Sequence, residues 1–329
     1  LDKAQENFKL MVIDLGGGTL DVTIMEKTKG DFQIKSTSGD NKLGGIEMDN
    51  ALTEYVIQEF KNQTGLNIRN DKKARERIRQ AVEIAKIQLS NLITTDINVI
   101  SIAKDQEGNP IDLELPITRA QLEELVSPII ERCRSPLMKA LKGAKLSPQD
   151  IDKIILIGGP TRMPAVKKFV TTVMGREPEG GLDPMEAVAM GAAIQGGIIS
   201  NEIRDVTVQD ILSLPLGIEV IDGSVDHIVE QFTPIPAKQS KLFMNPINST
   251  TPIKIHVVQG EGNMAYDCAS LGIFNLPDIP PATKDEPQVE VAFDIDINGI
   301  LNVTAKDINT LREANITITS RIGLTKGEI

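Results

Sequence analysis

The spacing of apolar residues changes near residue 203, and this change constrains the fold most. Before it, stretches with helical periodicity alternate with strand-like stretches, and residues 71–91 give the clearest helical pattern. From 211 to 320 no convincing helical periodicity occurs, and stretches such as PIKIHVVQGE alternate apolar with polar residues. The 329 residues also exceed one ordinary hydrophobic core. The sequence therefore predicts an α/β domain followed by an all-β sandwich, with the joint near 201–213.

Local signals predict the elements of the first domain. Alternating residues over 11–37 predict two strands joined by a glycine-rich turn, and helical periodicity appears at 47–62. Thr118 is the expected N-cap of a helix, with Glu123 and Glu124 close behind it. The stretch IDKIILIGG predicts a buried strand that runs into a glycine turn. The stretch DPMEAVAMGAAIQGGII predicts a helix whose small residues allow close packing.

The clearest hairpin of the second domain is EVAFDIDINGILNVTAKD. Its two halves alternate in polarity, and Asn298-Gly299 is expected to form the turn with a positive φ at both residues. The two histidines of the chain, His227 and His256, match no catalytic pattern, and we expect both to be strand or loop residues.

Composition argues against several classes of protein. The net charge of −11 argues against nucleic acid as the main partner, because phosphate binding needs a basic face. No apolar run approaches the roughly 18 residues of a membrane span, so no membrane segment is expected. Cys133 and Cys268 stand far apart and form neither a disulfide framework nor a metal-ligand spacing. These features favour the reducing cytoplasm.

The stretch DLGGGT places three glycines between an Asp and a Thr at the end of an expected strand. Glycines let backbone N–H groups approach an anion closely, since no Cβ stands in the way. Asp14 could then hold Mg²⁺ through water, and Thr19 could offer its hydroxyl to a phosphate oxygen. A glycine-rich hairpin turn without a ligand is the alternative, because short glycine motifs often occur without one.

Two further stretches favour a nucleotide. LIGGPTRMPAV puts a glycine pair between a strand and a helix, which suits the flat face of adenine or a phosphate at a helix N-terminus. EIAKIQLS puts Glu83, Lys86 and Ser90 on one helical face, for which a solvated surface is the alternative. The three stretches together favour a nucleotide-binding site.

These motifs, in this order, resemble those of the DnaK family, the 70-kDa heat-shock chaperones, along nearly the whole chain. In the first domain the similar stretches are DLGGGTLDVTI, LGG at 43–45, EIAKIQLS, GGPTRMP and DPMEAVAMGAA. In the second, LPLGIEV, TPIPAK, IHVVQGE, LGIFNL and DINGILNVTAKD resemble the family's peptide-binding β-sandwich. The resemblance implies an ATP-regulated chaperone that binds extended apolar segments of unfolded proteins.

The resemblance also implies a domain layout. Residues 1–205 would be lobe II of an actin-like ATPase domain, 206–210 the linker and 211–329 the sandwich. Lobe I and the helical lid are expected to be missing from this chain, which is then expected to be inactive alone in hydrolysing ATP to ADP and phosphate. The implied cofactors are ATP or ADP, Mg²⁺ and K⁺. J-domain and nucleotide-exchange co-chaperones are the implied partners of the intact protein.

The family's nucleotide-binding residues carry over onto matching positions. Asp14, Thr19 and Asp21 would serve catalysis, with Asp14 holding Mg²⁺ through water and Thr19 near the attacking water. The other contacts to phosphates, ribose and adenine would come from Gly16, Gly17, Gly18, Gly44, Gly45, Glu83, Lys86, Ser90, Gly158, Gly159, Pro160 and Arg162.

The family's substrate groove also carries over. Ile221 and Pro246 would arch over the bound peptide. Alternating Ile and Val in a sandwich also fit plain inter-sheet core, which is the alternative for this set. The implied groove residues are Ile218, Val220, Ile221, Phe243, Met244, Pro246, Ile253, Ile255 and Val289.

Some positions depart from the family pattern. Met185 stands where an acidic residue is usual, and Pro160 replaces a commoner Ser. In the linker VTVQD only Val206 and Val208 are apolar, so docking of the linker on the ATPase would bury less surface.

Two other functions fit parts of the sequence. One is a small-metabolite kinase, because actin-like lobes occur in such enzymes. The other is a non-catalytic scaffold that presents a peptide groove. The strand-rich second half argues against the metabolite kinase, which has no use for a sandwich ending in DINGILNVTAKD.

Overall fold

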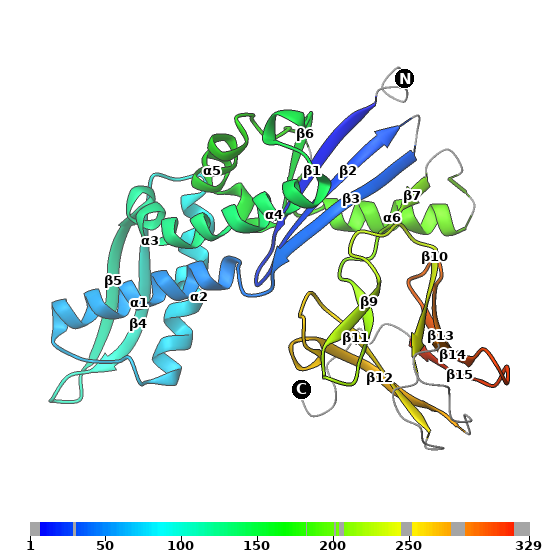
Figure 1. Ribbon diagram of the computed structural model, residues 1–329. Helices are drawn as coiled ribbons and strands as arrows, with labels where there is room; N and C mark the ends of the chain where they lie inside the picture. The colour runs from blue at the N-terminus through cyan, green and yellow to red at the C-terminus, as the bar shows by residue number, and fades with distance from the viewer. Residues whose placement is uncertain are drawn as a thin grey trace. The chain divides into compact units, whose positions relative to one another are not determined.

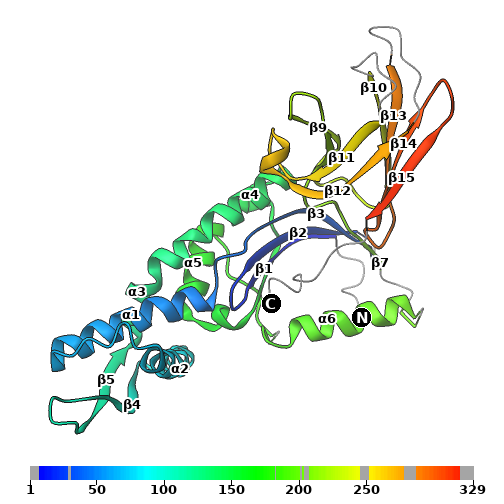
Figure 2. The same ribbon diagram turned by 90° about the horizontal axis from the view of Figure 1, so that it is seen from below.

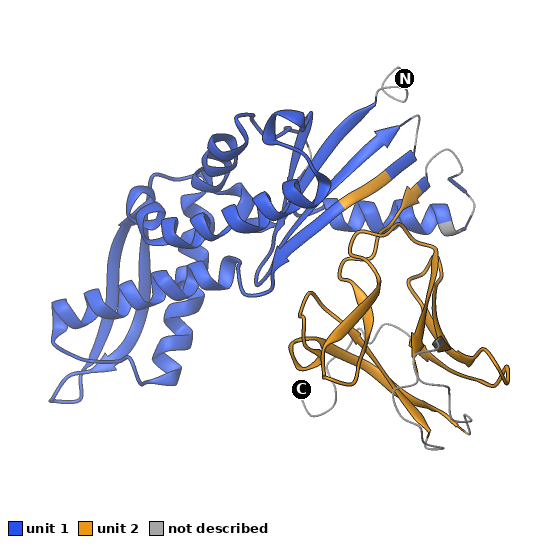
Figure 3. Cartoon of the chain, in the orientation of Figure 1, with its two compact units in different colours: residues 1–32, 36–207 blue, residues 33–35, 208–329 orange. Residues whose placement is uncertain are grey.

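The computed structural model describes residues 7–28, 31–181, 183–200, 202–203, 207–244, 252–277 and 287–318. The chain divides into two compact units, coloured separately in Figure 3. Unit 1 comprises residues 1–32 and 36–207, and unit 2 comprises residues 33–35 and 208–329. Each unit has a hydrophobic core of its own.

Strands β6, β1 and β2 and most of β3 form the framework of unit 1, in a five-stranded sheet of the order β6-β1-β2-β3-β7 (Figure 1). Residues 33–35 of β3 and 208–209 of β7 belong to unit 2. Strand β1 is antiparallel to β2 and parallel to β6. Alternate side chains of β1, Met11, Ile13 and Leu15, are buried in the core, as the alternating pattern predicts. The strands are β1 Phe8–Leu15, β2 Leu20–Thr28, β3 Asp31–Asp40, β6 Lys153–Ile157 and β7 Thr207–Gln209.

Helices and a separate hairpin complete unit 1. Helix α2 packs on α1 and on strand β4, and Figure 2 shows these elements together at one end of the unit. The hairpin consists of β4 Thr94–Lys104 and β5 Pro110–Thr118. The helices are α1 Gly45–Thr64, α2 Lys72–Leu89, α3 Arg119–Arg132, α4 Arg134–Ala144, α5 Pro164–Met174 and α6 Ala187–Ile199, with single 3₁₀ turns η2 Pro148–Asp150 and η3 Gly159–Arg162.

Helix starts follow the local signals, with one difference. Thr118 is the N-cap of α3, as predicted, and its hydroxyl accepts a hydrogen bond from the Gln121 backbone N–H. The residue that completes the capping box is Gln121, whose side chain also binds the Thr118 backbone N–H, and not Glu123 or Glu124. The reason is position, because only the third helical residue reaches back to the cap.

The small residues of α6 allow close packing at one described glycine. A Cβ added at Gly197 would lie 2.9 Å from the Ile203 side chain, whereas one at Gly191 or Gly196 would find nothing within 4 Å. None of the described side chains of α6 is buried, so the packing expected along the helix is found at this one position among the described residues.

Part of the expected linker is a strand. Residues 207–209 form β7, the exposed edge strand beside β3. The Thr207 hydroxyl donates a hydrogen bond to the Asp31 carboxylate at 2.5 Å. Val206 lies outside the described residues.

Two four-stranded sheets form unit 2, in the orders β10-β13-β14-β15 and β12-β11-β8-β9. Side chains from both sheets, among them Leu216, Val257 and Phe293, belong to one buried cluster. The strands are β8 Leu216–Glu219, β9 Val225–Val229, β10 Ala237–Met244, β11 Ile253–Gln259, β12 Ala269–Leu276, β13 Pro287–Ile295, β14 Leu301–Asp307 and β15 Glu313–Ile318, and η4 Ala265–Asp267 is a single 3₁₀ turn.

The β13–β14 turn differs from the predicted two-residue turn. Only Gly299 has a positive φ, of 76°, and Asn298 does not. The connection is longer because Asp296 organises it, and its carboxylate accepts hydrogen bonds from the N–H groups of Asn298 and Ile300. An Asp side chain that bonds to the backbone two residues on stabilises such a turn.

Phe293 tests whether the two sheets share one core. Its side chain is fully buried in the cluster that both sheets line. We expect Phe293→Ala to lower the free energy of unfolding of unit 2 by about 3–5 kcal/mol. Urea denaturation followed by circular dichroism measures this loss, with Ile273→Ala, an exposed site on β12, as the control. Equal effects of the two substitutions would contradict a shared core.

Candidate functional site

The glycine turn lies between β1 and β2. Asp14 pairs with Asp21, and Leu15 pairs with Leu20, so residues 16–19 close the hairpin. The Gly16 N–H donates to the Thr19 carbonyl at 2.9 Å. A Cβ added at Gly17 would find nothing within 4 Å, so open space borders the turn at this residue.

The start of α1 lies directly on this turn. The Gly45 and Ile46 N–H groups donate to the carbonyls of Gly16 and Gly17 at 3.0 and 2.7 Å. A Cβ added at Gly44 would lie 2.6 Å from the Gly17 carbonyl. Gly44 therefore has a packing reason to be glycine, and two N–H groups at the helix start are already occupied within the chain.

The second glycine pair follows β6, which runs beside β1 and ends opposite Asp14. Gly158 has φ 89°, a conformation that disfavours other residues. A Cβ here would lie 2.1 Å from the Leu15 carbonyl oxygen and 3.1 Å from an Asp14 carboxylate oxygen. The Gly158 backbone is therefore held against the end of β1, beside Asp14.

Lys86 of α2 joins these loops. Its ammonium is buried and lies 2.7 Å from the Asp49 carboxylate of α1, and it donates to the Gly45 carbonyl at 3.1 Å. The position of a Cβ at Gly45 would lie 3.1 Å from this ammonium and 3.2 Å from Pro160. Burial raises the pKa of Asp49, and the Lys86 charge opposes this shift. Sequence reasoning missed Asp49, because no local pattern links it to Lys86.

Glu83 and Ser90 lie on the same helix in different settings. The Glu83 carboxylate is about half exposed, and it pairs with Arg79 at 3.6 Å. Ser90 is the C-cap residue of α2, and its carbonyl accepts a bond from Arg119 at 3.5 Å. Of the three predicted residues of α2, only Lys86 is buried.

Arg162 is tied to a second acidic residue that the sequence analysis did not single out. Two Asp183 oxygens accept from one Arg162 nitrogen at 2.5 and 2.8 Å. Asp183 also accepts from the Met185 N–H at 2.9 Å. These bonds lower the pKa of Asp183, the backbone N–H contributing most. A Cβ at Gly159 would lie 3.4 Å from the Met185 sulfur, so these residues frame the Gly158–Arg162 loop.

Asp14 and Asp21 lie opposite each other at the end of the hairpin. Burial, and then the nearby charge of Asp21, raise the pKa of Asp14. Two neighbouring carboxylates repel each other, and a hydrated cation bound between them would reduce this repulsion. The described residues contain no cluster of three or more His, Cys, Asp or Glu side chains suited to a metal. The pair therefore fits a cation held partly by water and phosphate, as Mg²⁺ commonly is.

A pocket of about 710 Å³ lies in unit 2, at one edge of the core. Ile218, Ile255 and Val289 in its lining are buried, whereas Ile221 and Met244 are exposed. Pro246 lies outside the described residues. All the other predicted groove residues line this pocket: Ile218, Val220, Ile221, Phe243, Met244, Ile253, Ile255 and Val289.

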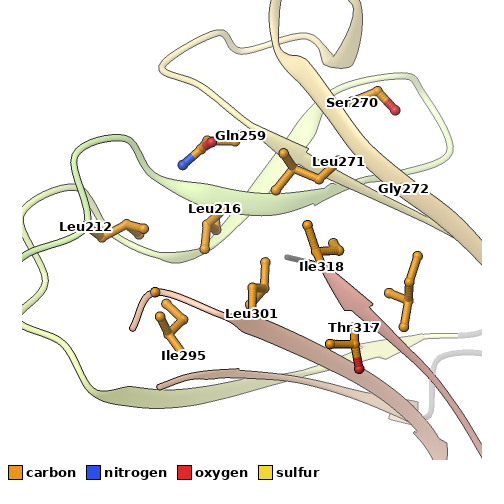
Figure 4. A pocket seen from close by; sticks show the side chains of 12 residues that line it. Leu212, Leu216, Gln259, Ser270, Leu271, Gly272, Ile295, Leu301, Thr317 and Ile318 are labelled. Carbon is orange, nitrogen blue, oxygen red and sulfur yellow. The ribbon is translucent and has the colours of Figure 1, made fainter. Parts of the chain in front are cut away.

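A further pocket of about 670 Å³ in unit 2 was not predicted (Figure 4). Leu212, Leu216 and Leu301 point into it, with Gln259 and Ser270 at its edge. On β8, Leu216 lines this pocket and Ile218 lines the other one. Side chains two residues apart on one face of a strand thus contribute to two cavities.

The mixed α/β architecture with several sheets fits an actin-like ATPase fold. The chain belongs to the Hsp70 family, whose model, described as Hsp70 protein, matches residues 1–329. It is 53% identical to the Chaperone protein DnaK of Cenarchaeum symbiosum, over 100% of this chain and 50% of that protein. It is 52% identical to the Chaperone protein DnaK of Nitrosopumilus maritimus, over 100% of this chain and 52% of that protein. The chain spans about half the length of these curated relatives.

Substitution is expected to destabilise the protein at one glycine of the site and to have little effect at another. Gly44→Ala would place a Cβ against the Gly17 backbone, and such overpacking costs about 1–3 kcal/mol. Gly17→Ala would point into open space and should change the free energy of unfolding by less than about 0.5 kcal/mol. Urea denaturation of both variants measures the difference. Equal stability of the two variants would contradict the close contact.

Stability should respond to the charge of Asp14 with a defined sign. Because the pKa of Asp14 is raised in the folded state, its ionisation disfavours folding. The contribution of the Asp14 carboxyl to the free energy of unfolding is fully present below its unfolded pKa of about 3.9. It is lost as pH rises through the pKa of the folded state. Asp14→Asn should therefore raise the free energy of unfolding at pH 7, and the gain should shrink as the pH approaches 4.

Asp105 provides a control of opposite sign. Hydrogen bonds from Asn109 lower the pKa of Asp105, so its ionised form favours the fold. This contribution is present above about pH 3.9 and is lost as pH falls through the folded pKa. Asp105→Asn should therefore destabilise the protein at pH 7. Urea denaturation at pH 7 and pH 4 tests both variants, and a less stable Asp14→Asn at pH 7 would be inconsistent with the raised pKa.

Proposed function

We propose that this protein is an ATP-regulated molecular chaperone that binds extended apolar segments of unfolded proteins. The observation that carries the proposal is the convergence of four separate stretches around the glycine turn. The start of α1 bonds to the turn at Gly16 and Gly17, Lys86 donates to the Gly45 carbonyl, and the Gly158 backbone lies against Leu15, the last residue of β1 before the turn. Membership of the Hsp70 family supports it, and the relatives carry the name Chaperone protein DnaK.

Within this proposal, the glycine turn holds the phosphates of ATP or ADP. Gly17, Gly18 and Thr19 would present backbone N–H groups and a hydroxyl toward them, since no side chain fills the space at Gly17. Gly16, whose own N–H bonds to the Thr19 carbonyl, would hold the turn in shape beside the phosphates. Gly44 and Gly45 keep the start of α1 close to the turn. Mg²⁺, when bound, would neutralise phosphate charge, and Asp14 would hold it through water, with K⁺ as a further cation.

Glu83, Lys86 and Ser90 of α2 would contact the ribose and the adenine. Gly158, Gly159, Pro160 and Arg162 would enclose the adenosine from the opposite loop. The ion pair with Asp49 fixes the Lys86 ammonium beside Gly45, and the bond to Asp183 fixes Arg162. Both side chains are thereby preorganised, which lowers the entropy lost on binding.

The reaction that we infer for the whole protein is attack of water on the γ-phosphate. Thr19 would orient that water, and Asp21 would accept a hydrogen bond from it or hold a cation. Catalysis of this kind depends on positioning and on charge stabilisation more than on covalent chemistry. The chain covers about half of its curated relatives, so hydrolysis belongs to the proposal for the whole protein.

We further propose that residues 1–205 form a nucleotide-binding lobe, 206–210 a linker and 211–329 a β-sandwich for peptides. Two sheets around one apolar cluster in unit 2 support the sandwich. J-domain and nucleotide-exchange co-chaperones are the proposed partners, and the cytoplasm is the proposed location. Among the described residues, no helix has the length and apolar character to cross a membrane.

The 710 Å³ pocket supports the peptide-binding role. Its buried floor would take one apolar side chain, and exposed Ile221 and Met244 at its rim would cover the chain of the peptide. Extended peptides bind in this way by bonding their backbone and burying alternate side chains. Neither a metabolite kinase nor a non-catalytic scaffold is favoured by the family of this chain.

Nucleotide binding should depend on the open space at Gly17. Gly17→Val would fill the space that the phosphates need, so we expect affinity for Mg·ADP to fall at least about tenfold, or about 1.4 kcal/mol. Isothermal calorimetry with the full chain measures this, and thermal unfolding without nucleotide controls for stability. A folded variant with unchanged affinity would place the phosphates elsewhere.

Peptide binding should depend on the pocket lining. Ile253→Asp would put a charge into the pocket and remove an apolar contact worth about 1.5–3 kcal/mol. Affinity for a fluorescent Leu-rich heptapeptide, measured by anisotropy, should therefore fall at least about tenfold. Met244→Asp tests the same pocket at an exposed residue, where a charge is not expected to unfold the protein. Ile273→Asp, at an exposed residue of β12 outside the pocket, is the matched control. If folded Ile253→Asp and Met244→Asp bind as the control does, the groove assignment fails.

A further inference from the structure

Three side chains of one sheet in unit 2 form a continuous chain of hydrogen bonds. The His256 Nδ1 atom lies 2.6 Å from a Glu219 carboxylate oxygen. The His256 Nε2 atom lies 2.8 Å from the Ser270 hydroxyl oxygen. The order carboxylate, imidazole and hydroxyl is that of the Ser-His-acid triad, which is recognised by geometry and not by sequence position. His256 matches no catalytic pattern in the sequence because its partners, Glu219 and Ser270, lie 37 and 14 residues away along the chain.

The bond to Glu219 sets the proton on the imidazole. An ionised carboxylate only accepts hydrogen bonds, so Nδ1 of His256 must be the donor in this pair. In the neutral ring Nε2 then carries no proton and accepts a hydrogen bond from the Ser270 hydroxyl. This tautomer is the one that a general base for a serine requires.

The strands of the sheet hold these groups in place. His256 is on β11, the strand between β8, which carries Glu219, and β12, which carries Ser270. Val257 pairs with Gly272 and Val258 pairs with Ser270, so Leu271 is an extra residue that forms a β-bulge. A bulge takes its backbone N–H out of the ladder and re-aims the neighbouring side chain, and bulges are frequent beside active sites.

The three side chains differ in their exposure to solvent, and the hydroxyl, the group that would act as the nucleophile, is the exposed one. Ser270 is exposed to solvent. The His256 side chain is 16% exposed and that of Glu219 is 34% exposed. The imidazole is therefore shielded and oriented, whereas the hydroxyl can be reached from solvent. Glu219 and His256 also border the 710 Å³ pocket, and Ser270 lies at the edge of the other pocket.

We propose that Ser270 is a nucleophilic serine that is acylated by small activated carboxylic esters, such as aryl acetates. The Ser270 oxygen attacks the ester carbonyl carbon, and its proton passes to Nε2 of His256. A new ester bond forms at Ser270, the bond to the aryl oxygen breaks, and the aryloxide leaves with the proton from His256. Glu219 keeps the imidazole in its productive tautomer and stabilises its transient positive charge. This site requires neither nucleotide nor bound peptide.

The test exposes the full chain to p-nitrophenyl acetate and measures acetylation by mass spectrometry of proteolytic peptides. Ser240 on β10 is the internal control, because it is exposed and hydrogen-bonds the Glu290 carboxylate at 2.7 Å without a histidine. We expect Ser270 to be acetylated at least about tenfold faster than Ser240. Equal rates at the two serines in the wild-type protein would overturn the proposal, and this comparison needs no substitution.

Substitutions then separate a reactive site from a merely accessible one. General-base catalysis contributes about 10²–10⁴-fold, so His256→Asn should slow acetylation of Ser270 by about 100-fold and leave Ser240 unchanged. Glu219→Gln should slow it by a smaller factor. Circular dichroism establishes that each variant is folded. A folded His256→Asn that acetylates Ser270 at the wild-type rate would show that the bonds only tie the strands together.

Discussion

Direct contact of backbone with backbone is the constraint on which the candidate nucleotide site depends. The carbonyls of Gly16 and Gly17 bind the first N–H groups of α1. A side chain at Gly44 would collide with this turn. A side chain at Gly158 would collide with Leu15 at the end of β1. Glycine at these two positions therefore lets the start of α1 and the loop after β6 lie against the hairpin of β1 and β2, while the space beside Gly17 stays open.

Features with a local period could be predicted from the sequence. The helix over 72–89, the cap at Thr118 and the inward alternation of β11 all depend on neighbouring residues. Pairs that depend on the assembled fold could not be predicted. Asp49 and Lys86 meet only because α1 and α2 pack together. The roles of the predicted nucleotide residues stay predictions.

The two faces of one strand have different proposed roles in unit 2. Along β11, Ile253 and Ile255 line the 710 Å³ pocket from the inner face. His256 lies between Ile255 and Val257, on the alternate face of the strand, where it meets Glu219 and Ser270, and it also borders this pocket. The pattern of apolar residues predicted the first face. It held no signal for the second, because the partners of His256 come from two other strands.

Amide hydrogen exchange with and without Mg·ADP tests the proposed phosphate site most directly. If the glycine segments hold the phosphates, added nucleotide should slow exchange at 14–19, 43–46 and 158–162, and leave 253–259 of unit 2 unchanged. The reason is that ligand contact restricts the opening that exchange requires. Unchanged exchange in the glycine segments at saturating nucleotide, or protection confined to other residues, would contradict the proposed site.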